Sequence, residues 1–440
     1  MRKTVAQRWI SEPVNSFISE SYTSGMVLFL ATVLALIFAN TGLQTWYHGF
    51  WQHELGFEID GQFFLNKSLH HWINDGLMAI FFFVVGLELK RELIGGELSD
   101  SRKAFLPVIA AFGGMVFPAL IYICFNPRGA SHAGWGIPMA TDIAFALGVL
   151  HILGKKIPIS VKVFLTVLAV ADDLGAVLVI AFFYTSNISI FNLGIGFAFL
   201  AILVIANRIG FRSAYFYAIF GIGGVWLFFL LSGVHSTIAA VLIAFTIPAT
   251  TLIDERAYIK KIQFLLLKFK NQDPNNKPLL ENDQLHTLDD IQKFTVYAMT
   301  PLQRLENKLH PVVSFIIIPI FAFANAGVTF SGINSETIFS KVTFGVIIGL
   351  LLGKMIGIAG VSSILVKSKI ANFPSGMTFA HVVGVSFLAS IGFTMSLFVT
   401  ELAFVDKTFI IQAKIGIFVA SIIGGLLGYI ILKNIKNKIS

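Results

Sequence analysis

Apolar stretches of helical length, separated by polar segments, recur along nearly the whole chain. A helix needs about 20 such residues to cross the ~30 Å hydrocarbon core of a bilayer. The pattern predicts twelve spans, at residues 23–40, 72–89, 104–124, 134–151, 159–185, 190–207, 213–230, 233–248, 310–329, 342–363, 378–400 and 408–432. We therefore expect an all-α polytopic membrane protein in which residues 1–440 form a single domain.

The composition agrees with this interpretation. With 56% hydrophobic residues, 13% charged residues and a mean hydropathy of +0.79, the chain is too apolar for a soluble protein of 440 residues. Residues 1–20 are polar and amphipathic, without a short apolar core followed by a cleavage site. No cleaved signal peptide is therefore expected.

Lysine and arginine residues predict the orientation of the spans, because they favour cytoplasmic loops. With twelve spans, 26 of the 32 fall in loops on one side and 4 on the other, and Lys354 and Lys414 lie inside spans. Both termini are therefore predicted to be cytoplasmic. Orientation also explains the net charge of +8 better than nucleic-acid binding does, since the basic residues form no single patch.

Two connecting segments differ from the others. Residues 249–308 lack sustained periodicity and contain a polar run at 271–278, so we expect a partly disordered cytoplasmic loop with short helices. On the outer side, residues 50–66 contain Asp60-Gly61, a pair favoured in tight turns, which predicts a small extracellular β-hairpin. An isolated hairpin is marginally stable, so we expect it to pack on another surface, such as that of a second copy of the chain. The alternative is an irregular loop.

Two adjacent carboxylates, Asp172 and Asp173, lie in the middle of the span 159–185. An ionised side chain at this depth costs about 2.5 to 3.5 kcal/mol on insertion scales. Two carboxylates that share one ammonium leave a net negative site for a small cation or a proton, and they should titrate as a coupled pair. The alternative is a salt bridge of either aspartate with Lys354 that only holds helices together.

Two spans contain residues that interrupt a helix at mid-depth, at 136–142 and at 390–396. Pro138 removes a backbone donor, and serine and threonine hydroxyls satisfy backbone groups where a helix unwinds. Paired broken helices are typical of transporters built on inverted repeats, here at about 104–185 and 342–432. We expect Asp142 to compensate the positive ends of the half-helices and Lys354 the negative ends.

Two further residues at span ends have open interpretations. Asp75 lies either on an access path or at an interfacial cap. His235 is either a titratable group that contributes to pH regulation or a hydrogen-bonded packing residue.

Five motifs together resemble those of the NhaA-type sodium/proton antiporters: Ala140–Val149, Asp172–Ala176, Phe321–Gly327, Gly353-Lys354 and Ile391–Ser396. The resemblance runs through essentially all twelve spans. It implies two inverted three-helix repeats with crossed, discontinuous helices four and eleven. It also implies pH-regulated, electrogenic export of sodium, with lithium as a second substrate, in exchange for external protons across the bacterial inner membrane.

The resemblance also implies roles for individual residues. Asp173 would bind sodium or protons alternately, with Asp172 either assisting or pairing with Lys354, and Asp142 and Thr141 would support the crossing and the site. The candidates for pH regulation are Glu88, Arg91, Glu92, Arg304, Glu306 and His310. Their alternative role is that of solvated cytoplasmic charges that fix the orientation.

Two features depart from the family pattern. Asn307 stands where the family often has histidine, and the preceding loop is longer than in compact members, so the activating pH is not predicted.

The hairpin matches the dimer contact of the family and implies a homodimer. Neither a cofactor nor a nucleotide is expected, and the alternating access of such antiporters needs none.

Three other classes fit the sequence less well. An intramembrane aspartyl protease uses two membrane aspartates, but its Gly-x-Gly-Asp motif precedes none of Asp142, Asp172 and Asp173. A sodium-coupled solute symporter would need a pocket for an organic substrate. A passive cation channel would not move protons uphill. We therefore expect a transporter and not an enzyme.

Overall fold

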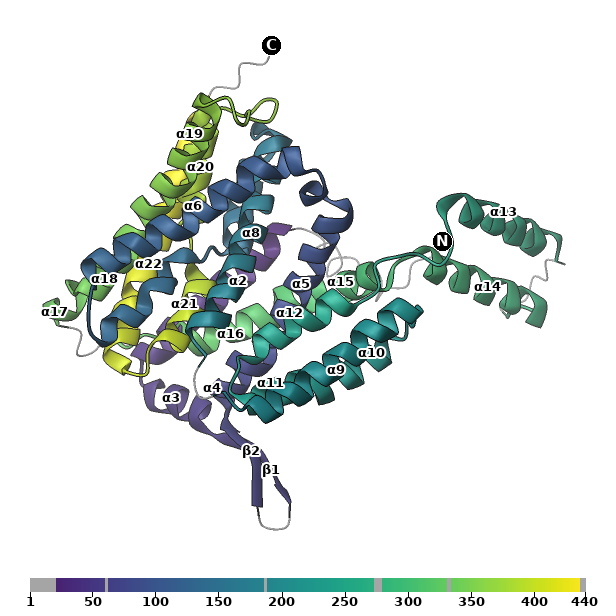
Figure 1. The fold of residues 1–440 in the computed structure, drawn as a ribbon, viewed down its shortest axis with the longest axis horizontal. Coiled ribbons are helices and arrows are strands. Elements are labelled where there is room, and N and C mark those ends of the chain that lie inside the picture. The colour runs from purple at the N-terminus through teal and green to yellow at the C-terminus, as the bar shows by residue number, and fades with distance from the viewer. Residues whose placement is uncertain (1–20, 60–61, 186–187, 273–278, 331–333, 436–440) are drawn as a thin grey trace.

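The computed structural model describes residues 21–59, 62–185, 188–272, 279–330 and 334–435. These residues are mostly helical, as predicted, and they include one two-stranded sheet. Figure 1 shows a body of packed helices, with the β-hairpin extending from one end and the helix pair α13 and α14 extending from the side. Residues 1–20, in which no cleaved signal peptide is predicted, lie outside the described residues.

One group of helices carries both interrupted spans, and we call it the site bundle. Within it, α6 packs along α8 and along the run from α18 to α19, while α22 packs on α18 and α20. Its elements are α6 (Ser101–Phe125), η4 (Ala130–Met139), α7 (Ile143–Leu153), α8 (Ile159–Phe183), α18 (Lys341–Ile348), η8 (Gly349–Gly353), η9 (Met355–Gly360), α19 (Val361–Lys367), α20 (Phe379–Ala389), α21 (Phe393–Ala403) and α22 (Lys407–Asn434).

The second group, the flanking bundle, packs beside the first. In it α5 lies against α12, α9 against α11, and α16 against α2, which also contacts α7 of the site bundle. Its elements are α2 (Ser21–Asn40), α4 (Leu69–Trp72), η2 (Ile73–Leu77), α5 (Met78–Gly95), α9 (Ile190–Ile209), α10 (Ala214–Phe220), η6 (Gly221–Trp226), α11 (Leu227–Ser232), α12 (Ser236–Thr246), α15 (Pro301–Val312), η7 (Val313–Ile317) and α16 (Ile318–Asn325). The remaining short elements are α3 (Gln44–Gln52), η3 (Glu97–Ser99), η5 (Gly154–Lys156) and α17 (Ser335–Ile338).

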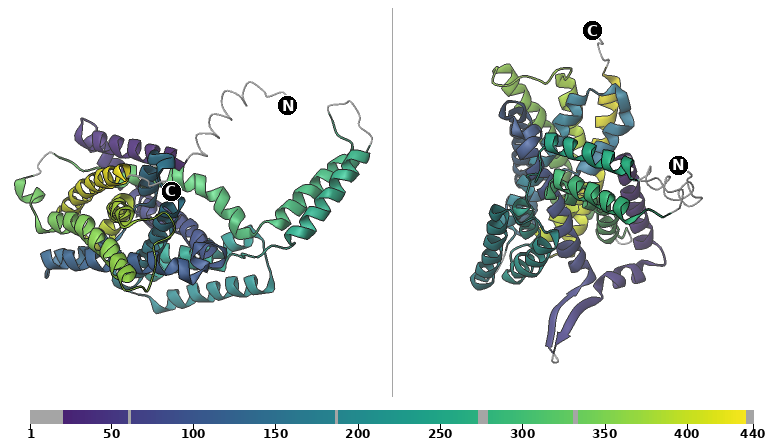
Figure 2. Two further views of the ribbon diagram at one scale, coloured as in Figure 1. Left: turned by 90° about the horizontal axis from the view of Figure 1, so that it is seen from above. Right: turned by 90° about the vertical axis from the view of Figure 1, so that its right-hand side faces the viewer.

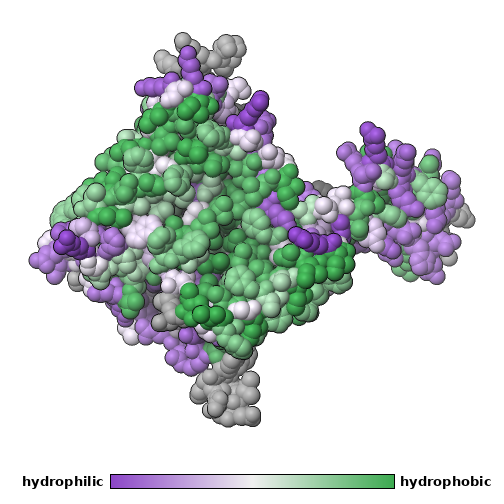
Figure 3. Space-filling model, viewed as in Figure 1, coloured by the Kyte–Doolittle hydropathy of each residue, from purple (hydrophilic) through white to green (hydrophobic). Residues whose placement is uncertain are grey.

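The surface of the helical body is that of a membrane protein. Hydrophobic residues cover most of the face in Figure 3, and hydrophilic residues gather at its ends and over α13 and α14. Large apolar side chains such as Phe112, Phe182 and Ile219 are exposed on this surface. An apolar surface of this extent, over helices long enough to cross a membrane, is typical of a surface that lipid covers.

The number of spans is supported only in part. Among the described residues, nine helical runs are long and apolar enough to cross a membrane, or ten when α20 and α21, bent by 46°, count as one. The two remaining predicted spans correspond to α5, which carries four charged residues in its second half, and to α12, which has only 11 residues. Length and composition alone therefore do not establish twelve.

The polar connections differ in how well the sequence predicted them. The hairpin is present, with β1 (Glu54–Ile59) antiparallel to β2 (Gln62–Ser68), while its turn at 60–61 lies outside the described residues. The long loop contains α13 (Glu255–Asn271) and α14 (Asn282–Ala298), each of 17 residues and longer than the short helices expected. The two helices pack on each other, and in Figure 2 the pair extends away from the body.

Inside the site bundle, two glycines let the backbones of α6 and η9 approach closely. A Cβ added at Gly357 would clash with the carbonyl oxygen of Gly113, and a Cβ added at Gly113 would clash with the carbonyl oxygen of Gly357. Because both obstacles are backbone atoms, α6 and η9 would have to separate.

We expect Gly357→Ala to lower the midpoint of thermal unfolding in detergent. The matched control is Gly194→Ala in α9, where a Cβ meets nothing within 4 Å. That change should leave the midpoint unchanged or raise it, since alanine favours a helix over glycine by about 1 kcal/mol. Equal midpoints for the two variants would contradict the proposed close contact.

Candidate functional site

The two interrupted spans cross where their helices stop. In the first, η4 and α7 are separated by Ala140 to Asp142, and in the second, α20 and α21 are separated by Ser390 to Gly392. The backbone N–H of Asp142 donates to the carbonyl of Ile391 at 2.6 Å. The hydroxyl of Ser396 donates to the carbonyl of Ile137 at 2.8 Å. Direct hydrogen bonds therefore join the two breaks.

A single carboxylate, that of Asp142, caps the two half-helices that leave the crossing. Its Oδ1 accepts from the backbone N–H of Phe145 at 3.2 Å and so caps α7. Its Oδ2 accepts from the backbone N–H of Thr394 at 3.1 Å and from the hydroxyl of the same residue, in the first turn of α21. The carboxylate therefore faces the positive ends of both helices. Thr394 lies in the predicted break at 390–396, but its bond to Asp142 was not predicted from the sequence.

Asp172 is the paired member of the two adjacent carboxylates. Its Oδ2 forms a salt bridge with Lys354, and the hydroxyl of Thr141 lies 2.6 Å from the same oxygen. Lys354 also donates to the hydroxyl oxygen of Thr141 at 2.9 Å, and all three residues are buried. The Thr141 hydroxyl further lies 2.8 Å from the carbonyl of Ala389, at the carboxyl end of α20. Lys354 thus lies against Asp172, and Thr141 contacts the negative helix end.

Asp173 is the member that faces open space. It lines a cavity of about 250 Å³ together with Asp142 and Thr141. Its buried Oδ1 has no hydrogen-bond partner among the described residues, and the same holds for Oδ1 of Asp172. A carboxylate oxygen without a protein donor can accept a proton or ligate a small hard cation.

The cavity lies between the two bundles. The site bundle contributes residues of α7, α8 and α21, and the flanking bundle contributes residues of α5, α15 and η7. Its lining includes Arg91, whose side chain is 45% exposed, near the end of α5 that is far from the hairpin. Asp173 is therefore approached from the side opposite the hairpin.

Most of the predicted pH-regulation residues lie together along this cavity. Arg91 bridges two carboxylates, with Nε 3.0 Å from Glu306 and Nη2 3.1 Å from Glu92. Nε2 of His310 is 4.0 Å from a carboxylate oxygen of Glu88. No ion pair of Arg304 is found within the described ranges.

Asp75 and His235 lie elsewhere, toward the hairpin side. The carboxylate of Asp75 is 3.2 Å from His71 and from the hydroxyl of Ser236, and it does not line the cavity. Nε2 of His235 is 2.9 Å from the carbonyl of Tyr184. The structure therefore does not bring these two residues together with Asp173 or with the Arg91 cluster.

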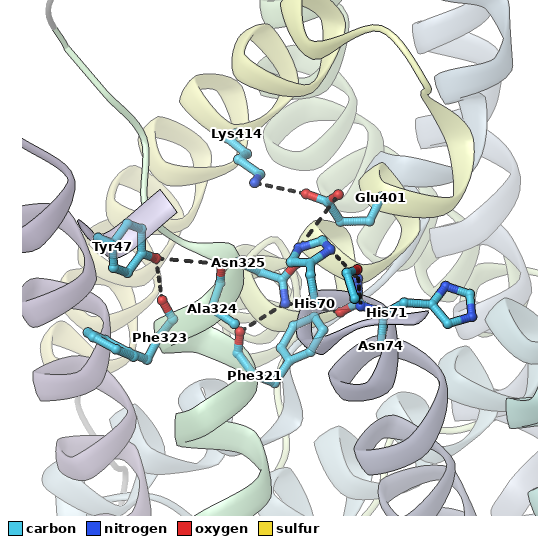
Figure 4. A network of polar contacts seen from close by, with 11 residues as sticks. Tyr47, His70, His71, Asn74, Phe321, Phe323, Ala324, Asn325, Glu401 and Lys414 are labelled. Carbon is cyan, nitrogen blue, oxygen red and sulfur yellow. Dashed lines mark hydrogen bonds and ion pairs between the residues drawn. The ribbon is translucent and has the colours of Figure 1, made fainter. Parts of the chain in front are cut away.

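A second buried polar cluster was missed by sequence reasoning. Figure 4 shows Lys414 pointing to Glu401, which in turn faces His70 beside Asn325. Glu401 falls just outside the predicted span 378–400, and Lys414 was noted only as a charge inside a span. A charge within an apolar helix was the available signal, but its partners lie on other helices and are visible only in the fold.

Comparison with known proteins assigns the chain to a family. The model of the family described as Na+/H+ antiporter 1 matches residues 15–432. Among curated proteins, the Na(+)/H(+) antiporter NhaA of Oleidesulfovibrio alaskensis is 46% identical over 424 residues, which cover 96% of this chain and 93% of the relative. The protein of the same name from Acidithiobacillus ferrooxidans is 47% identical over 434 residues, covering 97% and 98%. That from Helicobacter pylori is 45% identical, covering 96% and 95%. The chain therefore belongs to the Na+/H+ antiporter 1 family.

Proposed function

We propose that this protein is a secondary active antiporter that exports sodium, with lithium as a second substrate, in exchange for external protons. The observation that carries the proposal is the contrast within the carboxylate pair. Asp172 is held by Lys354 and does not line the cavity, whereas Asp173 lines the cavity between the bundles and forms no ion pair among the described residues. The named relatives, which are Na+/H+ antiporters, support the same substrates.

In the proposed cycle a proton and a sodium ion compete for Asp173. Loss of the proton leaves a carboxylate that attracts sodium, and return of a proton displaces the ion. Asp172, fixed by Lys354 and Thr141, supplies a second oxygen beside the first. Asp142 keeps the crossing intact, so that the oxygens stay in place during exchange.

Alternating access would expose Asp173 to one side at a time. A cavity that reaches Asp173 from the Arg91 side supports an inward-open state, with both termini and the Arg91 cluster in the cytoplasm of a bacterium. If more protons enter than sodium ions leave, exchange is electrogenic and gains about 2.3 kcal/mol per net charge per 100 mV.

Three finer assignments belong to the same proposal. The cluster of Glu88, Arg91, Glu92, Glu306 and His310 would sense cytoplasmic pH, because four of its members line the cavity that leads to Asp173 and the fifth, Glu306, is paired with Arg91. The β-hairpin would join two copies into a homodimer in the inner membrane, since its strands project from the body. Asp75, which contacts His71 and Ser236, would lie on the outer access path.

The direct test is sodium-induced collapse of a preformed pH gradient in proteoliposomes of the purified protein. We expect collapse with sodium and with lithium but not with potassium. The assay is scanned from acidic to alkaline pH, so that an inactive pH range is not mistaken for lack of function. Absence of proton movement at every pH, with sodium uptake that depends on an organic solute, would favour a symporter instead.

A further inference from the structure

On the hairpin side the two bundles touch, and α21 carries the contact. Thr394, Phe398 and Glu401 lie at positions i, i+4 and i+7 and therefore share one face of this helix. Thr394 binds Asp142 at the crossing. The ring of Phe398 is 5.5 Å from that of Phe82 in α5 and 6.2 Å from that of Phe321 in α16. Beyond the site, this helix face thus seals the boundary between the bundles with aromatic rings.

Glu401 lies at the outer end of this face and has one partner in each bundle. Its Oε1 forms a salt bridge of 2.8 Å with Lys414 of α22, inside the site bundle. Its Oε2 lies 4.0 Å from Nε2 of His70 in α4, which belongs to the flanking bundle. The side chains of Glu401 and Lys414 are only 13% and 10% exposed, so little water screens their salt bridge, whereas that of His70 is 31% exposed. Lys414 therefore positions a carboxylate that reaches across the boundary.

His70 is held in place by a closed ring of hydrogen bonds, most of which is visible in Figure 4. Its Nε2 is 2.9 Å from Oδ1 of Asn325, and its Nδ1 is 3.4 Å from Nδ2 of Asn74. Nδ2 of Asn325 donates to Oδ1 of Asn74 at 3.1 Å and to the carbonyl of Phe321 at 3.0 Å. Both amides come from the flanking bundle. The ring therefore fixes the imidazole with one nitrogen toward Glu401.

We propose that His70 and Glu401 form a latch between the bundles that keeps the hairpin side closed while the cavity is open on the opposite side. The inference rests on the proposed function, because alternating access moves one bundle against the other around the site. Thr394 and Glu401 are two turns apart on one rigid helix, so a movement of α21 that exposes Asp173 to the hairpin side must separate Glu401 from His70.

The charges that face His70 come from several elements. Glu401 of α21 attracts an imidazolium, whereas Lys414 of α22 and the neighbouring His71 repel it. Burial lowers the pKa of His70, and the carboxylate of Glu401 opposes this effect. Glu401 attracts the imidazole most strongly when His70 carries its second proton, which would sit on Nδ1 and requires the amide of Asn74 to turn its oxygen toward that nitrogen.

The test is a reversible cross-link. In a background with Cys124, the one cysteine of the chain, replaced by serine, His70→Cys and Glu401→Cys are joined by a short bis-methanethiosulfonate reagent. Sodium-dependent proton exchange is then measured in proteoliposomes before and after treatment with dithiothreitol. We expect the cross-link to stop exchange and the reductant to restore it.

The matched control joins Glu401→Cys to Lys414→Cys, which links two helices of the site bundle and crosses no boundary. This cross-link should leave exchange largely intact. Unchanged exchange in the cross-linked His70/Glu401 pair, or equal inhibition by both cross-links, would overturn the latch. Lack of exchange in all the reduced variants and in the unmodified protein would instead refute the proposed function.

A second measurement does not depend on transport. Met78 is 1% exposed and lies one turn before Phe82 in α5, at the sealed boundary. In Met78→Cys, Cys124→Ser protein, a membrane-impermeant thiol reagent is applied from the hairpin side at mildly acidic pH. Adding Glu401→Gln should raise the labelling rate severalfold, because the latch loses its charge. An unchanged rate would contradict the proposal even if no variant transports.

Discussion

Replacement of Asp173 by asparagine is expected to abolish sodium-dependent proton exchange while the protein still folds. Asparagine keeps the size of the side chain but cannot release a proton or supply a negative charge to sodium. The nearest carboxylates are already engaged, since Asp172 is held by Lys354 and Asp142 caps two half-helices. The measurement is the proteoliposome assay with sodium, in which the variant should not exceed protein-free vesicles.

The neighbouring Asp172→Asn variant is the control for folding. Asp173→Asn removes a buried negative charge whose oxygen has no hydrogen-bond partner among the described residues. The unfolding midpoint of this variant should therefore be unchanged or higher. Asp172→Asn leaves Lys354 buried without its anion, which typically costs about 3 to 5 kcal/mol. Normal exchange by Asp173→Asn, or an equal loss of stability in both variants, would contradict the assigned roles.

The second large effect is expected at the crossing, where Asp142→Ala should strongly destabilise the protein. The change removes the acceptor of the backbone N–H groups of Phe145 and Thr394 and of the Thr394 hydroxyl. Each buried donor left unpaired costs about 1 to 3 kcal/mol, so we expect a loss of roughly 3 kcal/mol or more in the free energy of unfolding. Thermal unfolding in detergent measures it.

The matched control for this prediction is Asp406→Ala. Asp406 caps α22 by accepting from the backbone N–H of Thr408 at 2.8 Å, but it is exposed and serves one helix end only. Its loss should cost about 1 kcal/mol, the usual value for a helix cap. If the two substitutions had equal effects, the capping of two half-helices by Asp142 would not contribute to stability.

The apolar pattern predicted the helical membrane architecture and the Asp60-Gly61 pair predicted the small hairpin, because both depend on local sequence. It was less successful where a helix continues through a polar stretch. Helix α15 begins at Pro301, after the capping hydroxyl of Thr300, rather than near residue 310. This helix is amphipathic and runs without a break into η7 and α16. The mean hydropathy along the sequence therefore rises only several residues after the helix has begun.

The site shows a similar division. Asp172, Asp173, Asp142 and Lys354 were selected because charge inside an apolar span is costly, and the structure places them around one crossing. Their roles in exchange stay predictions. The partners of Glu401 could not be predicted, since His70, Asn325 and Lys414 come from three other helices and no local pattern joins them.

The shared cap at Asp142 has a consequence for protein engineering. Asp142 is the N-cap residue of α7, and the same side chain also caps α21, whose own N-cap residue, Gly392, offers no side-chain acceptor. A chimera that receives α21 from a relative but keeps its own residue 142 combines the donor groups at position 394 of one protein with the carboxylate at position 142 of another. In such chimeras, residues 140–145 and 390–396 should therefore be taken from the same protein, although they are far apart in the sequence.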